Sequence, residues 1–167
     1  MLRLDRRSFE VRGRTVTHEF VRFPEVVVVL ARDAEGRLLF VRQYRGALDQ
    51  RILELPAGRI EAGENPALAA ARELEEETGY RAERVEALFT FWPAPGYSDE
   101  RIWVFAASGL QRTQTHFHPG EDLELVLLAD AEWEAAMRSG ELRDGKTLLS
   151  LLAARAELRV PTAGAGA

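Results

Sequence analysis

Glu73, Glu76 and Glu77 are the residues of this sequence whose type and spacing could do chemistry. At 100° per residue, these three positions fall within about a third of the circumference of a helix. Carboxylates gathered on one helical face repel one another, and a divalent cation relieves that repulsion because hard cations such as Mg²⁺ favour oxygen ligands. Three glutamates alone are more often a solvated acidic face, so the neighbouring residues must decide between a surface and a metal site.

The neighbouring residues predict a helix that follows a glycine-punctuated loop. Pro66 suits the first helical turn, residues 67–71 are strong helix formers, and Gly79 is a natural C-terminal stop. The loop segments 56–58 and 62–64 predict a tight connection, in which backbone carbonyls can also face a metal ion. An apolar stripe on a separate helical face is predicted to pack on a core, and it consists of Ala67, Ala71, Leu74 and Thr78.

Length and composition indicate one soluble globular domain. A chain of 167 residues is long enough to bury roughly two thirds of its unfolded surface, and 46% apolar and 29% charged residues are ordinary values. The net charge of −5 argues against nucleic-acid binding, which relies on a basic surface, but a bound cation would still admit a nucleotide. The chain has no cysteine, no apolar leader and no run of membrane-spanning length, so we expect no membrane association and a cytoplasmic location.

The hydrophobic pattern predicts strands and helices in mixed order. We expect a β-hairpin over 9–23, a strand buried on both faces over 26–31, strands over 37–44, 52–55, 85–92, 101–107 and 123–128, and late helices over 131–139 and 146–158. This order indicates an α/β fold, an α/β/α sandwich around a mixed sheet. We expect an N-terminal hairpin in residues 1–23, the main domain in 24–160, and a disordered tail in 161–167.

The stretch from Gly58 to Tyr80 matches the signature of the Nudix hydrolases, Gly-x5-Glu-x7-Arg-Glu-U-x-Glu-Glu-x-Gly-U, where U is a bulky apolar residue. Every fixed position is filled, and Tyr80 is the one loose fit at a U position. The resemblance implies the Nudix fold and a site for Mg²⁺, with Mn²⁺ as the alternative, held by the Ala57 carbonyl, Glu73, Glu76 and Glu77. Arg72 is expected to hold the glutamates by charge-assisted bonds, and Glu64 to support the loop.

Other segments resemble the ADP-ribose pyrophosphatase branch of that family. They are residues 41–45, 53–58, 93–100 and 140–148, and Pro95 lies fifteen residues beyond Tyr80. The resemblance implies Mg²⁺-dependent hydrolysis of ADP-ribose to AMP and ribose 5-phosphate. The alternatives are another nucleoside diphosphate sugar or a dinucleotide as substrate, or a catalytically inactive module that senses a nucleotide.

Substrate contacts are expected from the loop over 93–100 and from the segments 41–45 and 53–58. The proposed set is Arg42, Arg45, Glu54, Pro95, Gly96, Ser98 and Glu100. Arg42 and Arg45 either bind the diphosphate bidentately, or one of them pairs with Glu54. Candidates for stacking on adenine are Trp92, Tyr97 and Trp103, although alternating aromatic residues in strands are more often core.

The catalytic residues implied by the resemblance are Glu121, Glu76 and Arg72. Glu121 is the expected general base, because the loop before the last strand carries that base in the family. Asp122 and Glu124 compete with it, but strand alternation favours a solvent-facing Glu124.

The N-terminal hairpin is expected to make the protein a homodimer. Its apolar alternation is ample for a peripheral segment, and comprises Phe9, Val11, Val16, Phe20 and Phe23. The resemblance further implies that the hairpin reaches the partner's active site.

Overall fold

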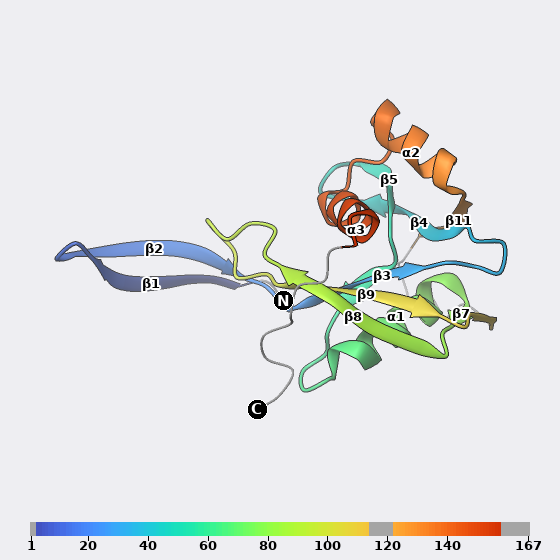
Figure 1. The fold of residues 1–167 in the computed structure, drawn as a ribbon. Helices are drawn as coiled ribbons and strands as arrows, with labels where there is room; N and C mark the ends of the chain where they lie inside the picture. The colour runs from blue at the N-terminus through green and yellow to red at the C-terminus, as the bar shows by residue number, and fades with distance from the viewer. Residues whose placement is uncertain (1–2, 114–121, 158–167) are drawn as a thin grey trace.

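The computed structural model describes residues 3–113 and 122–157 of the chain (Figure 1). The elements are, in order, β1 (Arg3–Val11), β2 (Arg14–Arg22), β3 (Val26–Ala31), β4 (Leu38–Arg45), β5 (Gln50–Glu54), β6 (Ala57–Arg59), α1 (Pro66–Thr78), β7 (Tyr80–Arg81), β8 (Arg84–Phe91), β9 (Ile102–Ser108), β10 (Gln111–Arg112), β11 (Leu123–Leu128), α2 (Asp130–Ser139) and α3 (Gly145–Arg155). Within these residues, no helix has the length and apolar character needed to cross a bilayer.

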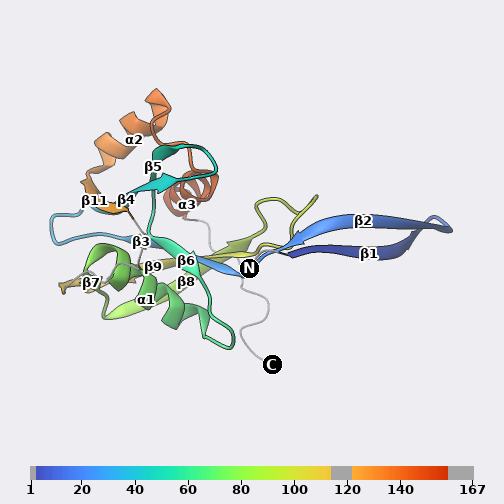
Figure 2. The ribbon, with the colours of Figure 1, turned by 180° about the vertical axis from the view of Figure 1, so that it is seen from behind.

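A mixed four-stranded sheet in the order β6-β3-β9-β8 forms the centre of the main body. Its strands β3 and β9 run parallel, and the outer pairs are antiparallel. A second, antiparallel sheet has the order β11-β4-β5. Strands β7 and β10 pair with each other in a separate two-stranded sheet. The β1–β2 hairpin forms a sheet of its own and projects away from the body (Figures 1 and 2).

Strand β3 separates two hydrophobic cores, because successive side chains of a strand point to opposite faces. Val26 and Val28 belong to the core that contains residues of α2 and α3, whereas Val27 and Val29 belong to the core that contains residues of α1. All six residues of β3 are buried. The predicted α/β/α sandwich around a mixed sheet is therefore confirmed.

Helix α1 begins and ends where its sequence predicts. The Asn65 side chain accepts a hydrogen bond from the Ala67 amide, and Gly79 ends the helix in the left-handed conformation at φ 68°. The predicted apolar stripe was partly wrong: Ala69 and Ala70 are fully buried, while Ala67 and Ala71 are only half-buried. The buried arc differs because α1 packs against β3 and β6 as well as β8 and β9.

The N-terminal hairpin is longer than its apolar pattern indicated. Strand β1 begins at Arg3, and its first half is charged, with Arg6 donating to Glu19 on β2 at 2.6 Å. Arg12 and Gly13 both have positive φ, at 51° and 74°, which is the requirement of a two-residue type I′ hairpin turn. Cross-strand ion pairs thus extend the ribbon into the first half of β1, where the sequence has no hydrophobic alternation that would predict a strand.

Three short strands were not predicted, because pairing rather than propensity forms them. Strand β6 lies in the segment predicted as a loop and pairs with β3, and β7 pairs with β10. Helix α2 begins one residue early, at Asp130, and α3 begins at Gly145. Helix α3 ends at Arg155, before the predicted end at Leu158, because Ala156 caps it and the backbone is left-handed at Glu157, where φ is 53°. Leu158 itself and the predicted tail lie outside the described residues.

Candidate active site

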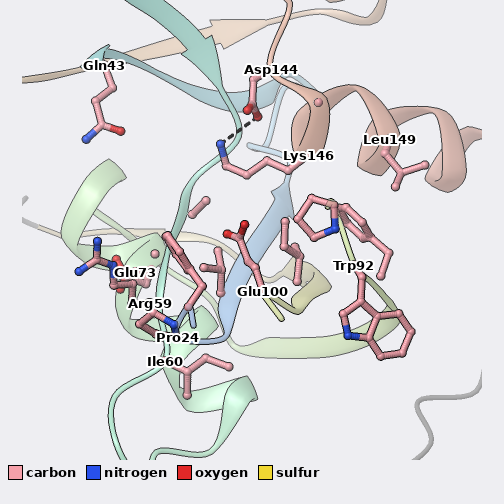
Figure 3. Close-up of a pocket in the computed structure, with 18 of the residues that line it drawn as sticks. Pro24, Gln43, Arg59, Ile60, Glu73, Trp92, Glu100, Asp144, Lys146 and Leu149 are labelled. Atoms are coloured by element: carbon pink, nitrogen blue, oxygen red, sulfur yellow. Dashed lines mark ion pairs between the residues drawn. The ribbon is translucent and has the colours of Figure 1, made fainter. Parts of the chain in front are cut away.

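A cleft of about 1120 Å³ lies between the N-terminal end of α3 and the loop that leads into α1 (Figure 3). Glu73 and Glu77 line it from α1, while Arg45 and Lys146 line it from β4 and α3. We call the first side, with β6 and α1, the acidic wall, and the second side, with β4, β5 and α3, the ion-pair wall. The cleft therefore brings together residues that lie about a hundred positions apart in the chain.

The acidic wall is held by close packing between β6 and α1. The Ala57 amide donates a hydrogen bond to Glu77 Oε2 at 3.0 Å. A Cβ atom on Gly58 would lie 1.9 Å from the carboxyl carbon of Glu73, far inside contact distance. A Cβ atom at this glycine of the Nudix signature would therefore displace the Glu73 carboxylate, which is the far end of a flexible side chain.

Arg72 ties the glutamates of this wall to the preceding loop. Its guanidinium donates to both Glu64 oxygens at 2.9 and 3.0 Å, to Glu73 at 2.8 Å and to Glu76 at 3.1 Å. A further bond reaches the Arg59 carbonyl at 3.0 Å. The hydrogen bonds to Glu64 raise the pKa of Arg72 above its usual value, against the effect of burial, and the bonds to Glu73 and Glu76 add to the rise. These contacts match the supporting roles expected of Arg72 and Glu64.

The donor set of the acidic wall fits a hard divalent cation, because it consists of carboxylate and carbonyl oxygens. In the described part of the chain, no three acidic or histidine side chains converge as a ready-made cation site. One reason is that Arg72 engages oxygens of both Glu73 and Glu76. Glu73, Glu77 and Ala57 line the cleft, whereas Glu76 does not.

The ion-pair wall is a quartet of alternating charges. Arg45 donates bidentately to the Glu54 carboxylate at 2.6 and 2.7 Å, and the Lys146 ammonium contacts Glu54 and lies 2.9 Å from Asp144. The Glu54 side chain is only 1% exposed. Burial alone would raise the pKa of Glu54, but the hydrogen bonds from Arg45 and the charge of Lys146 outweigh it and hold the pKa below its usual value.

The two arginines proposed for the diphosphate have different surroundings. Arg45 pairs with Glu54, as the second alternative predicts, and it also lines the cleft, while its contact with a diphosphate stays a prediction. Arg42 does not line the cleft, and it donates to Glu141 at 2.8 Å. Arg45 is thus the arginine of this pair that is placed for a ligand.

The loop over 93–100 contributes its two ends to the cleft. Pro93 and Glu100 line the cleft, whereas Pro95, Gly96 and Ser98 do not, and the substrate contacts expected of these three residues stay predictions. The middle of the loop instead joins the hairpin: the Val21 amide donates to the Tyr97 carbonyl, and the Phe23 amide donates to Asp99, at 2.8 and 2.9 Å.

Glu100 points into the centre of the cleft, below Lys146 (Figure 3). The residue is half-buried, and burial raises the pKa of its carboxyl group. The charge of Lys146 opposes this rise and the charge of Asp144 adds to it.

The three aromatic candidates for stacking on adenine differ in their exposure and in whether they line the cleft. Trp92 lines the cleft and is 57% exposed, whereas the exposed Tyr97 is not among the lining residues. Trp103 is buried, donates its indole N–H to Glu25, and lies under the Arg101 guanidinium at 4.2 Å from the ring centroid. Trp103 is therefore a core residue, and Trp92 is the candidate for stacking.

The expected general base, Glu121, lies outside the described residues and stays a prediction. Of its two competitors, Asp122 forms an ion pair with Arg51. Glu124 is exposed on β11, opposite Arg42 on β4, in agreement with strand alternation.

Comparisons with known proteins identify the family. The sequence model of the NUDIX domain matches residues 22–146. The chain belongs to the Nudix family. It is 38% identical to the ADP-ribose pyrophosphatase of Bacillus subtilis over 142 residues, which cover 83% of this chain and 76% of the relative. It is similarly 37% identical to the ADP-ribose pyrophosphatase of Mycobacterium tuberculosis, with 86% and 71% covered.

Two further matches complete the comparison. A methanol dehydrogenase activator of Bacillus methanolicus is 38% identical, with 83% of this chain and 76% of the relative covered. Among solved structures, an ADP compounds hydrolase superposes with a TM-score of 0.77 at 20% identity, over 93% of this chain and 92% of that one. The latter likeness supports the Nudix fold alone. The resemblance of the sequence to the Nudix family and to its ADP-ribose pyrophosphatases is therefore confirmed.

Sequence reasoning missed Lys146 and Asp144 as residues of the cleft. Asp144 caps α3 by accepting from the Thr147 amide at 3.0 Å, so an N-cap signal was present. Lys146 is the sole lysine among 22 basic residues, which was a signal of its own.

Proposed function

We propose that this Nudix chain hydrolyses ADP-ribose to AMP and ribose 5-phosphate with Mg²⁺ as its cofactor. The observation that carries the proposal is the cleft itself, in which Glu73 and Glu77 of the Nudix signature share one space with Arg45 and Lys146. Its volume of about 1120 Å³ is slightly above the usual range for small-molecule sites, which leaves room for a nucleotide joined to a sugar phosphate. The names of the relatives from Bacillus subtilis and Mycobacterium tuberculosis favour ADP-ribose among such compounds.

In the proposed reaction, the oxygen of water adds to one phosphorus and gives up a proton to a general base, for which Glu121 is the prediction, while the bond between that phosphorus and the bridging oxygen breaks. Glu73, Glu76, Glu77 and the Ala57 carbonyl would hold Mg²⁺, which supplies charge neutralisation for the diphosphate. Arg72 keeps Glu73 and Glu76 in place through its bonds of 2.8 and 3.1 Å. Trp92 offers an exposed ring at the edge of the cleft for the adenine base.

A substrate panel tests this proposal. We expect ADP-ribose to give the highest kcat/KM with Mg²⁺, above GDP-mannose, NADH, diadenosine polyphosphates and dATP. A higher value for GDP-mannose or a dinucleotide would contradict the substrate and leave the family unchanged. The absence of turnover with every compound, together with nucleotide binding, would favour a sensing module instead.

The same proposal includes a homodimer formed through the N-terminal hairpin. Strand register places Phe9, Val11, Val16 and Phe20 on one face of the β1–β2 ribbon, and Phe9 and Val11 are exposed. An isolated two-stranded ribbon is marginally stable in water, so a partner surface would stabilise it. Light scattering that gives a monomer of 18.7 kDa at micromolar concentration would contradict the dimer. A cytoplasmic location is likewise proposed, and cell fractionation tests it.

A further inference from the structure

Residues 97–100 connect the N-terminal hairpin to the cleft. They belong to the loop between β8 and β9, which lies beside the base of the β1–β2 ribbon (Figures 1 and 2). Val21, near the end of β2, lies opposite Ser98 in a parallel bridge. The Asp99 side chain contacts the hairpin, and the next residue, Glu100, lines the cleft. Two adjacent carboxylates of one loop therefore serve different parts of the molecule.

The backbone bonds between β2 and this loop follow the pattern of a parallel ladder. The Val21 amide donates to the Tyr97 carbonyl at 2.8 Å, and the Asp99 amide donates to the Val21 carbonyl at 3.3 Å. Further along, β3 and β9 form a regular parallel pair that begins with Val26 opposite Ile102. The loop thus runs from a pairing with the hairpin into a pairing within the central sheet.

A break in register separates these two pairings. The hairpin side, residues 21–26, is one residue longer than the loop side, residues 98–102. At the break, the Phe23 amide donates to Oδ1 of the Asp99 side chain at 2.9 Å, and Pro24 has no amide hydrogen to donate. The Asp99 carboxylate therefore supplies the acceptor that a backbone carbonyl supplies in a regular ladder.

The ion pair of Asp99 is a weaker contact than this hydrogen bond. Arg22 Nη1 lies 3.5 Å from Asp99 Oδ2, and the two side chains are 46% and 40% exposed. Exposed pairs of this kind contribute little to stability, and Arg22 also pairs with Asp5 at 3.0 Å. The charge of Asp99 therefore matters less than its oxygen acceptor, which an asparagine side chain also has.

The backbone on both sides of Glu100 is bonded to the opposing chain. On one side is the contact of Asp99 with the hairpin, and on the other the Arg101 carbonyl accepts from the Val26 amide at 2.9 Å. The Glu100 amide itself donates to Ser98 Oγ at 3.1 Å. Its side chain points into the cleft (Figure 3). These bonds fix the direction from which the Glu100 carboxylate enters the cleft.

We propose that Asp99 is a positioning residue for the substrate site: by accepting the Phe23 amide it fixes the loop against the hairpin and so holds the Glu100 carboxylate where the substrate binds. This inference rests on the proposed function for the role of Glu100 as a substrate contact. Precise placement matters because a shift of about 1 Å in a contact residue can cost on the order of 10²-fold in rate.

Hydrogen exchange of one backbone amide tests the contact. Asp99→Ala should speed the exchange of the Phe23 amide at least about tenfold, because it removes the acceptor. Asp99→Asn keeps an oxygen acceptor and should leave the exchange rate within about threefold of wild type. NMR of ¹⁵N-labelled protein measures both rates. Equal exchange in wild type and Asp99→Ala would overturn the inference, whatever the substrate is.

A double-mutant cycle tests whether Asp99 acts through Glu100. Asp99→Ala should lower kcat/KM about 5- to 20-fold, and Asp99→Asn should recover most of that loss. In a Glu100→Ala background the same change should cost less than about twofold, because the group that Asp99 positions is already gone. A merely structural role would give the same factor in both backgrounds and would overturn the inference.

The matched control is Asp5→Ala. It removes another carboxylate that pairs with Arg22 on the same ribbon but leaves the loop contact in place, so kcat/KM should stay within about twofold. Should Asp99→Ala not fold, Asp99→Glu takes its place in the exchange measurement and in the cycle. The longer side chain keeps the charge and displaces the acceptor, so the same losses are expected.

The cycle uses the best compound of the substrate panel, which separates this inference from the proposed function. If GDP-mannose or a dinucleotide is best, the proposed substrate fails, and the coupling of Asp99 to Glu100 is decided with that compound. If no compound is turned over, the affinity for ADP with Mg²⁺ replaces kcat/KM in the cycle. Independent factors with ADP-ribose as the best substrate would overturn the inference and leave the proposed function standing.

Discussion

The two walls of the cleft are built in opposite ways. The acidic wall comes from a short stretch of chain, in which β6 leads through one loop into α1. The ion-pair wall is assembled from β4, β5 and the start of α3, and the contact between Lys146 and Glu54 joins residues 92 positions apart. Local sequence therefore specifies the first wall, whereas only the tertiary fold brings the second one together.

The walls also differ in charge balance. In the acidic wall one guanidinium, that of Arg72, serves Glu64, Glu73 and Glu76 together. In the ion-pair wall Arg45 and Lys146 match Glu54 and Asp144 one to one. We therefore expect changes in the acidic wall to act mainly on catalysis through the metal, and changes in the ion-pair wall to act mainly on binding and stability.

The largest effect is expected from Glu77→Gln in the acidic wall. Glutamine can still accept the Ala57 amide bond but loses the charge that would hold the metal, so kcat should fall by about 10²- to 10⁴-fold. The matched control is Glu75→Gln, because Glu75 is on the same helix and pairs with Arg81 at the surface. Steady-state kinetics with a Mg²⁺ titration would measure both, and EDTA should abolish wild-type activity. Full turnover in excess chelator would contradict the metal site.

The next effect concerns stability and lies in the ion-pair wall. Glu54→Gln leaves Arg45 and Lys146 without their buried counter-charge, which should lower the free energy of unfolding by about 3 kcal/mol at pH 7. The control Glu141→Gln disrupts only the exposed pair with Arg42 and should cost less than about 0.5 kcal/mol.

The pH dependence of the same variant sharpens the comparison. Because the pKa of Glu54 in the folded state lies below its ordinary value of 4.5, its stabilising contribution is present above that value. The contribution is lost as pH falls below about 4.5 and through the lowered folded-state pKa. Urea unfolding between pH 7 and pH 3 should therefore show a steeper loss for wild-type protein than for Glu54→Gln, and parallel curves would refute the charge-balance argument.

Gly58→Ala tests whether the packing of the acidic wall is as tight as the geometry indicates. The new methyl group would displace the Glu73 carboxylate, so we expect at least about a tenfold loss in kcat, with only a small loss of stability because the end of this side chain can move. Gly46→Ala is the matched control, since the nearest atom to its added Cβ is 4.0 Å away in Tyr44. Equal behaviour of the two variants would show that Glu73 can move without consequence.

The same contrast between a wall formed by one segment and a wall assembled by the tertiary fold explains which parts of the molecule the sequence predicts. Helix α1, its caps and its glutamates were predictable, because helical periodicity and the signature lie in one segment. Strand β6 was not, since Ala57, Gly58 and Arg59 have no strand preference and pair only because β3 is there. Lys146 could not be placed either, because its contact with Glu54 depends on where the tertiary fold brings the start of α3 relative to β5.

The smallest effect is expected for Glu100, which faces both walls and has a raised pKa because it is half-buried in the cleft. A folded-state pKa above the ordinary value means that the ionised carboxylate destabilises the fold at neutral pH, and that this cost disappears as pH falls below the ordinary value.

Glu100→Gln removes that charge, so we expect the melting temperature at pH 7 to rise by about 1–3 °C, while activity on ADP-ribose falls. The gain should shrink between pH 7 and pH 4, because wild-type Glu100 then takes up a proton. Glu86→Gln, a matched change on the exposed side of β8, should leave both melting temperature and activity unaltered. Thermal unfolding across this pH range would measure the difference, and a melting temperature lowered at pH 7 would mean that the carboxylate is favourably bound in the cleft.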